Sequence, residues 1–362
     1  MEQELTEIRV EGGREEQNQQ QHSNSTVRRE EEFKHFDIIS TENDIEDHHY
    51  FSSSASLSPT GNAKIMKEWR VLDRNLPDSI YVRAYEGRID LLRAVIIGPA
   101  GTPYHDGLFF FDIKFPSDYP DSPPKVCYRS FGHRLNPNLY KNGYVCLSLI
   151  NTWSGDENEK WKPSQSTILQ VLVSIQGLVL NAKPYFNEPA FAKMPKNSAP
   201  WKGNSLSYNR NAFILSCKTM LCILRRPPRF FEEMVVQHFR DRAEAILTAC
   251  NAYITGQANI GDQPITTNGG RRTRRRNSRS RTFKASMGSV YAELIKSFKE
   301  NGASLENFEI LDTSKTFMDR LCCLSNKVSM CGLCIWLLLL VLMALCFAII
   351  VSSCIWLFRR EI

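Results

Sequence analysis

The sequence predicts an α+β domain over residues 61–250, and three observations support this. Apolar residues with helical spacing open the region at Ile65, Trp69 and Leu72. The next stretches, "IYVRAYEG", "DLLRAVIIGP" and "GLFFFDIKFP", are typical of strands in an antiparallel meander. Longer segments with helical spacing close the region. Strands and helices are therefore segregated along the chain, as in α+β folds.

The prolines of "FPSDYPDSPPKV" separate the strands from the later helices. Proline removes backbone donors and fixes φ, so this segment indicates a rigid, extended crossing rather than a central strand. We then expect a buried helix in "STILQVLVSIQGLVL", a second over residues 211–224, and a third in "RFFEEMVVQHFRDRAEAILTACNAY" after the break at Pro227 and Pro228.

The segments flanking this domain differ sharply in composition. Residues 1–60 carry 14 acidic and 5 basic side chains with almost no apolar periodicity, which predicts a disordered acidic tail. Residues 251–288 are expected to form a basic flexible linker, because seven arginines lie between Arg271 and Arg281. Residues 289–330, which include the amphipathic stretch "SVYAELIKSFKE", are expected to form a juxtamembrane segment.

A transmembrane helix is predicted over residues 331–358, followed by a short tail, 359–362. No charge occurs in the 31 residues between Lys327 and Arg359, and about 20 apolar residues span a bilayer core. Trp336 and Trp356 lie near the two ends, where amphipathic rings favour the membrane interface. We expect insertion after synthesis, with everything before the span in the cytosol. The long apolar run favours the endoplasmic reticulum or a later secretory membrane over the mitochondrial outer membrane, although Arg359 and Arg360 favour the latter.

Eleven cysteines follow a charged N-terminus that does not resemble a secretory signal, so reduced thiols are expected. "CGLC" and the Cys322–Cys323 pair offer only one two-residue spacing and no nearby histidine. No metal site is therefore expected. Cys322 and Cys323 are either acylation sites beside the membrane or unmodified thiols.

The arginine run allows three interpretations: contact with anionic lipid headgroups, binding to nucleic acid, or a nuclear import signal. Its position ahead of the span favours lipid or a plain linker. No aromatic residues alternate with the arginines to stack on bases, so nucleic acid is not an expected partner. Phosphorylation of Ser278 or Ser280 would weaken an attraction to lipid.

The segment "NPNLYKNGYVCLSL" carries the candidate catalytic residues. A nucleophilic cysteine needs access and a group that stabilises the charge developing on the attacked carbonyl. The Asn138 amide offers such a donor, and Gly143 would let the chain turn to bring Cys146 beside it. The pattern alone leaves open that Cys146 is a small buried hydrophobe. No histidine is identifiable as its base, which argues against a cysteine protease.

Five segments, in order over roughly residues 64–200, resemble the ubiquitin-conjugating enzymes. They are "IIGPAGTPYHDGLFFFDIKFP", "YPDSPPKV", "NPNLYKNGYVCLSL", "WKPSQSTILQVLVSIQ" and "NEP". The long segment between Cys146 and Trp161 is most similar to the large conjugating enzymes, including the conjugating domain of giant inhibitor-of-apoptosis proteins. The resemblance implies the ubiquitin-conjugating fold, with an N-terminal helix, a meander sheet and C-terminal helices.

The resemblance also implies an activity and its residues. Cys146 would accept ubiquitin from the activating enzyme as a thioester and pass it to a substrate lysine. Asn138 would hold the oxyanion, and Glu188 is a candidate for positioning the lysine, although a solvated loop carboxylate is an equal alternative. A thioester is already activated, so no cofactor or metal is expected and ATP is used by the activating enzyme. The expected partners are ubiquitin, the activating enzyme and membrane lipid.

The chain departs from the family pattern at two positions. The family's His-Pro-Asn tripeptide begins here with Asn136, whose amide is expected to replace a structural hydrogen bond. Asp121 stands where many conjugating enzymes carry an apolar anchor for ligases, and a carboxylate resists desolvation in an apolar pocket. We therefore expect an atypical ubiquitin ligase as partner, or direct choice of substrate. The acidic insertion at Asp156, Glu157 and Glu159 either attracts basic substrates or is a solvated loop.

Two other functions remain open on the sequence. One is a non-catalytic ubiquitin-binding scaffold of the same fold, against which Cys146 argues. The other is a conjugating enzyme for a ubiquitin-like modifier, which nothing in the sequence excludes.

Overall fold

The computed structural model describes residues 33–40, 45–53, 57–196, 198–261 and 278–308 and contains a five-stranded sheet. The strands lie in chain order: β1 (Phe36–Ile39), β2 (Ile80–Tyr85), β3 (Leu91–Ile97), β4 (Leu108–Lys114) and β5 (Lys125–Tyr128). β2 to β4 form the predicted antiparallel meander, and β5, which the sequence did not predict, extends it antiparallel to β4. β1, which the sequence did not predict, pairs in parallel with β2.

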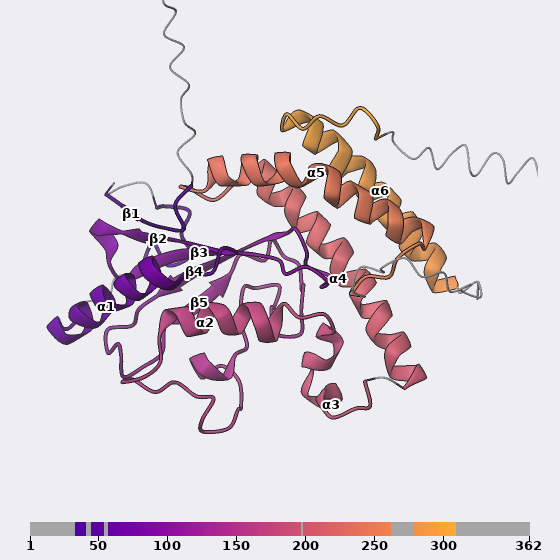
Figure 1. Cartoon of the computed structure of the whole chain (residues 1–362). Helices are drawn as coiled ribbons and strands as arrows, with labels where there is room; N and C mark the ends of the chain where they lie inside the picture. The colour runs from indigo at the N-terminus through magenta and orange to yellow at the C-terminus, as the bar shows by residue number, and fades with distance from the viewer. Residues whose placement is uncertain (1–32, 41–44, 54–56, 197, 262–277, 309–362) are drawn as a thin grey trace, which may run out of the picture. The chain divides into compact units, whose positions relative to one another are not determined.

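Six helices are present in the described residues (Figure 1). They are α1 (Pro59–Asn75), α2 (Ile168–Ser174), α3 (Pro189–Ala192), α4 (Ala199–Arg225), α5 (Glu232–Thr255) and α6 (Ser278–Glu300). α1 begins where the Ser58 hydroxyl accepts a bond from Gly61 N, and α2 begins at a capping box between Thr167 and Gln170. α2 continues as a π-helical turn, Ile175–Val179. The α+β fold class is confirmed.

α1 and α2 cover one face of the sheet. Ile65, Leu72 and Leu172 from these helices are fully buried with alternate residues of the strands, such as Leu92 and Ala94, in one apolar cluster. Burial of this kind contributes about 25 cal/mol for each Å² of apolar surface removed from water. This face therefore supplies the main core.

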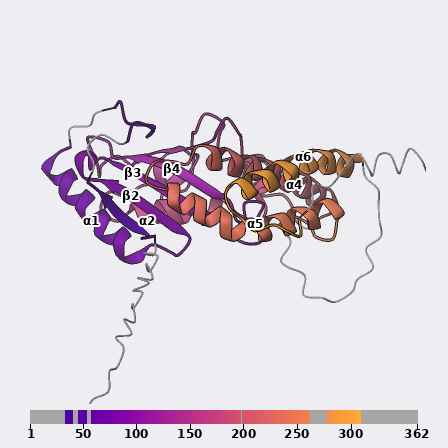
Figure 2. The ribbon, with the colours of Figure 1, turned by 90° about the horizontal axis from the view of Figure 1, so that it is seen from above.

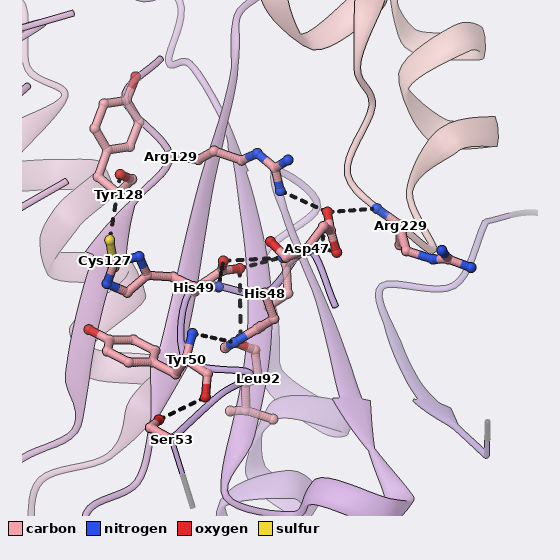
Figure 3. A network of polar contacts seen from close by, with 12 residues as sticks. Asp47, His48, His49, Tyr50, Ser53, Leu92, Cys127, Tyr128, Arg129 and Arg229 are labelled. Atoms are coloured by element: carbon pink, nitrogen blue, oxygen red, sulfur yellow. Dashed lines mark hydrogen bonds and ion pairs between the residues drawn. The ribbon is translucent and has the colours of Figure 1, made fainter. Parts of the chain in front are cut away.

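The opposite face, here called the back face, carries an ionic network. The β3–β4 register sets Arg93 directly across from Asp112, and Arg93 Nε lies 2.6 Å from Asp112 Oδ1. Asp47 binds Arg93 at 2.8 Å. It also binds Arg129 at 2.8 Å (Figure 3). Burial opposes ionisation of Asp112, but Arg93 and His48 hold its pKa below the ordinary value.

This network corrects the prediction of a disordered tail over residues 1–60. Within the described residues, 36–39 form β1 and 45–53 pack on the back face, where His48 Nε2 donates to Leu92 O at 3.0 Å. Ile45 is buried against Tyr85 and Leu91. The acidic composition hid this role because Asp47 is compensated by arginines far away in the sequence. Residues 1–32, 41–44 and 54–56 lie outside the described residues.

The predicted linker over 251–288 and juxtamembrane segment from 289 also need correction. α5 ends at Gly256, which adopts a left-handed conformation, and α6 starts at Ser278. α6 runs beside α4 and α5 (Figure 2) and buries Met287, Leu294 and Phe298 completely. The apolar stripe was visible in the sequence, but its packing partners were not. α6 is therefore part of the folded helical layer.

The predicted transmembrane helix, 331–358, lies outside the described residues, as do the 359–362 tail, Cys322 and Cys323. Residues 271–277 of the arginine run also lie outside them. Among the helices that the structure does describe, none is both long and apolar enough to cross a membrane.

Candidate active site

The turn from Asn136 to Cys146 folds back on itself. Leu139 pairs with both Asn136 and Val145 in isolated bridges, and Cys146 N donates to Asn138 O at 2.9 Å. Gly143 has φ +88°, and a Cβ there would lie 2.6 Å from Cys127 Sγ. Only glycine fits this reversal. The turn thus places Asn138 and Cys146 side by side, as the sequence predicted.

The Asn138 side chain is directed at the backbone of the cysteine. Its Nδ2 donates to Cys146 O at 3.0 Å, and its buried Oδ1 has no hydrogen-bond partner in the described part of the chain. One N–H of the amide is engaged, and the second is available to an oxygen near the thiol. The amide is therefore held next to the position where charge would develop.

Asn136 holds this arrangement in place through buried hydrogen bonds. It is fully buried, and its Nδ2 donates to Tyr104 Oη at 2.8 Å and to Val179 O at 2.7 Å. Its Oδ1 accepts from Asn138 N at 2.8 Å. A side-chain amide thus satisfies donors and acceptors from three segments at once.

Cys146 is 4% exposed, and its environment holds the thiol in the neutral form at rest. Burial raises the pKa of Cys146, a hydrogen bond from Tyr140 and the charge of Arg134 lower it in part, and Glu188 raises it. The Arg134 guanidinium lies 4.5 Å from the centre of the Tyr140 ring. A resting thiolate is not required if the substrate is itself a thioester.

Glu188 lies close enough to influence the thiol. It precedes α3 and follows Asn187, whose Nδ2 lies 3.3 Å from Asn136 Oδ1. Its charge acts on Cys146, Tyr140 and Tyr208. The structure therefore groups all three candidate site residues, Cys146, Asn138 and Glu188, around one thiol.

Sequence reasoning missed Arg134, Tyr140 and Tyr208 at this site. Tyr140 lies within the quoted motif, and its spacing from Asn138 was the available signal. Arg134, from the loop before Asn136, acts electrostatically on Cys146, and both Arg134 and Glu188 act on Tyr208 of α4. Only the tertiary structure brings Tyr208 near these two charges.

Comparison with known proteins decides the family. Residues 64–212 match the family model described as ubiquitin-conjugating enzyme. A protein of Arabidopsis thaliana named as ubiquitin-conjugating enzyme E2 38 is 48% identical over 277 residues, 75% of this chain and 82% of the relative. The chain belongs to the ubiquitin-conjugating enzyme family.

Longer relatives share the same region. Ubiquitin-conjugating enzyme E2 25 of Arabidopsis thaliana is 56% identical over 227 residues, 62% of this chain and 37% of that protein. The dual ubiquitin-conjugating enzyme and ubiquitin-protein ligase BIRC6 of Homo sapiens is 38% identical over 240 residues, 62% of this chain and 5% of that protein. This member of the family spans only 25% to 37% of the length of three Arabidopsis relatives.

The two departures from the ubiquitin-conjugating pattern have clear structural settings. Asn136 makes the hydrogen bonds described above, so an amide fills the first position of the tripeptide. Asp121 is exposed, and its backbone N donates to Asp118 O at 2.8 Å. The Asp121 carboxylate is therefore exposed to solvent.

A cavity of about 420 Å³ lies between the insertion and α2, and its lining begins at Leu147, the residue that follows Cys146. Val173 and Leu178 of this helical segment are 43% and 65% exposed. Within the insertion, Asp156, Glu157 and Glu159 are all exposed, and Glu157 pairs with Lys160 at 2.6 Å. The cavity is lined by Leu147, Ser148, Leu149, Asn158, Glu159, Lys160, Lys162, Gln165, Ser166, Gln170, Ser174 and Leu178.

Proposed function

We propose that this chain accepts ubiquitin from the activating enzyme as a thioester on Cys146 and transfers it to a lysine of a substrate. The observation that carries the proposal is the reciprocal pairing of Asn138 and Cys146. Cys146 N donates to Asn138 O at 2.9 Å, and Asn138 Nδ2 donates to Cys146 O at 3.0 Å. An oxyanion donor is thereby fixed beside a thiol before any substrate arrives.

In the charging step, Cys146 Sγ attacks the carbonyl carbon of the thioester on the activating enzyme. The new C–S bond forms as the old one breaks, and the Cys146 proton passes to the departing thiolate. The reaction exchanges one thioester for another, so it needs no cofactor at this site.

In the transfer step, a lysine amine attacks the Cys146 thioester. The carbonyl oxygen becomes an oxyanion, which the free N–H of Asn138 stabilises, and Cys146 then leaves as thiolate. The amine loses a proton as the isopeptide bond forms, and Glu188 is placed to accept it or to orient the amine. Positioning and charge stabilisation supply the catalysis.

A gel-based charging assay tests this proposal on the full chain in detergent, with activating enzyme, ATP and ubiquitin. We expect an adduct that reducing agent removes and that Cys146→Ala lacks. Cys146→Ser should give an adduct that survives reduction, because an oxyester replaces the thioester. Absence of an adduct from folded protein would reject ubiquitin transfer and favour a ubiquitin-like modifier or a scaffold.

Asn138→Ala tests whether Asn138 acts in charging of Cys146 or in discharge to lysine. We expect nearly normal charging but discharge to free lysine slower by about 10²-fold, since losing one oxyanion donor costs about that much. Glu188→Gln should slow discharge less and leave charging unchanged. Normal discharge by Asn138→Ala would remove Asn138 from the mechanism.

A membrane tether through residues 331–358, at the endoplasmic reticulum, completes the proposal. Its support is the uncharged run of 31 residues with tryptophans near both ends. Alkaline carbonate should leave the chain in the membrane pellet, and protease added outside the vesicles should remove the domain that contains Cys146. Release by carbonate would overturn the tether.

An atypical ubiquitin ligase, or none, fits the exposed Asp121. Asp121→Phe should increase binding of ring-type ligases in a pull-down, because it restores an apolar anchor. No gain in binding would show that this position does not govern ligase choice.

A further inference from the structure

An aromatic surface adjoins the thiol at the corner formed by α3 and the start of α4. Tyr185 stacks on Phe191 with ring centres 4.7 Å apart and an interplanar angle of 8°. Trp201 lies 5.9 Å from Phe191, and Tyr208 lies 6.2 Å from Tyr185. All four rings are only half-buried, whereas large aromatic side chains are removed from water most completely in a protein core. Met194 beside them is 36% exposed.

Positive charge surrounds these rings. Lys183, Lys193, Lys196 and Lys202 are all exposed, and Glu188 is the single acidic residue between 183 and 202. Four lysines and one glutamate give this segment a net charge of +3. Lys196 Nζ lies 5.7 Å from the centre of the Phe186 ring. Within the described part of the chain, none of the four lysines has an acidic partner in an ion pair.

The aromatic surface is continuous with the catalytic site. Tyr185 lies two residues before Asn187 and three before Glu188, so the rings and the segment that contacts the motif belong to one short stretch of chain. Asn187, which directly follows Phe186 and precedes Glu188, bonds Asn136 beneath the motif. A chain lying over the rings would therefore pass close to Cys146.

We infer that Tyr185, Phe191, Trp201 and Tyr208, with the surrounding lysines, bind an acidic segment of the acceptor protein that also carries apolar side chains, and so deliver a neighbouring lysine to Cys146. This rests on the proposed function. The rings bury the apolar side chains, and the lysines attract the carboxylates. Acidic flanking residues complement the surface charge, whereas basic ones are repelled.

The probe is a fluorescent synthetic peptide with one lysine flanked by glutamate, leucine and phenylalanine. The control peptide replaces each glutamate by arginine. Fluorescence anisotropy measures binding to the full chain in detergent, and gels measure transfer of ubiquitin to each peptide. We expect the acidic peptide to bind more tightly, with affinity that falls as salt increases.

The test variant combines Lys193→Glu, Lys196→Glu and Lys202→Glu, all exposed positions that leave the rings in place. The matched control combines Lys284→Glu, Lys296→Glu and Lys299→Glu on the exposed side of α6, with the same change in net charge. We expect the test variant to bind the acidic peptide about tenfold more weakly, because three favourable surface pairs become repulsive. The control should change affinity about twofold or less. Trp201→Ala should weaken binding at any salt concentration.

Charging with ubiquitin separates this inference from the proposed function. Normal charging with equal affinity for both peptides would overturn the inference and leave the enzyme intact. Failed charging with selective peptide binding would reject the enzyme and support the surface. Stronger binding of the aromatic surface and its lysines to anionic vesicles than to the acidic peptide would also overturn the inference, because the lysines would then bind a membrane. Tighter peptide binding after deletion of residues 1–32 would support it, showing that the chain's own acidic segment competes for the same surface.

Discussion

The Cys146 loop and the back face of the sheet are both held by buried polar groups, but the two regions use opposite chemistry. Asn136 fixes the loop through neutral amide hydrogen bonds, whereas Arg93, Asp112 and Asp47 fix the back face through full charges. Neutral amides do not titrate, so the loop keeps its geometry at any pH at which the domain stays folded. The ionic network depends on pH and is costly to break on one side.

The largest expected effect is the loss of Arg93. Its side chain is fully buried, and Arg93→Met would leave Asp112 charged without its partner. We expect the free energy of unfolding to fall by about 3–5 kcal/mol, measured by urea denaturation. Arg70→Met, at an exposed position of α1, is the control and should change stability by less than about 0.5 kcal/mol. Equal effects of the two variants would show that the network contributes nothing specific.

Loss of Asn136 should cost less in stability but more in catalysis. Asn136→Ala leaves Tyr104 Oη, Val179 O and Asn138 N without this partner, so we expect a loss of roughly 2 kcal/mol. Discharge to lysine should slow as well, because Asn138 loses its support. Asn136→His should restore the rate of discharge to lysine more fully than the free energy of unfolding. Normal discharge by Asn136→Ala would contradict the role given to the amides, since the Cys146 loop would then keep its active geometry without them.

The pH dependence of stability sharpens the contrast. Burial lowers the pKa of His48, so its neutral form favours the fold, and the stability it contributes is present above pH 6.5 and lost below. Asp47 and Asp112 also have lowered pKa values despite their burial, so their contribution is lost as pH falls below about 4.

We therefore expect the free energy of unfolding to decrease from pH 7 downward, by at most about 1.4 kcal/mol per pH unit for each proton bound. Urea denaturation at several pH values measures this. His48→Gln should reduce the change just below pH 6.5 and leave the one below about pH 4. Some of the upper change should persist, because burial also lowers the pKa of His133 and of His238. A wild-type stability that is constant down to pH 4 would contradict the assignment.

The smallest expected effect concerns Tyr140. Its hydrogen bond lowers the pKa of Cys146 against the stronger effect of burial, so Tyr140→Phe should raise that pKa further. Alkylation of Cys146 by iodoacetamide at pH 7.5 should slow about two- to threefold. Arg134→Gln should act in the same direction, and Arg134→Lys should restore part of the rate. Faster alkylation in Tyr140→Phe would mean that the ring shields the thiol rather than tuning it.

Sequence patterns predicted the parts of the fold whose signals are local. The strands β2 to β4, the helical spacing of Ile65, Trp69 and Leu72, and the turn joining Asn138 to Cys146 all occur as expected. β1 and α6 were missed or misassigned for a common reason. β1 is too short to signal its burial alone, and the apolar stripe of α6 does not reveal what it packs against. Each is stabilised by partners distant in the chain.

By itself, the sequence determined the chemistry that is available: a cysteine, an amide spaced to meet it across a glycine turn, and an uncharged run of 31 residues. Only the tertiary structure decided which groups surround the thiol and which acidic residues are compensated. Spacing along the chain sets contacts across one turn, but Tyr208, Glu188 and Arg134 meet because the sheet and helices pack. Asp47 is held ionised by Arg93 and Arg129 for the same reason. Long-range contacts of this kind have no signal in a local pattern.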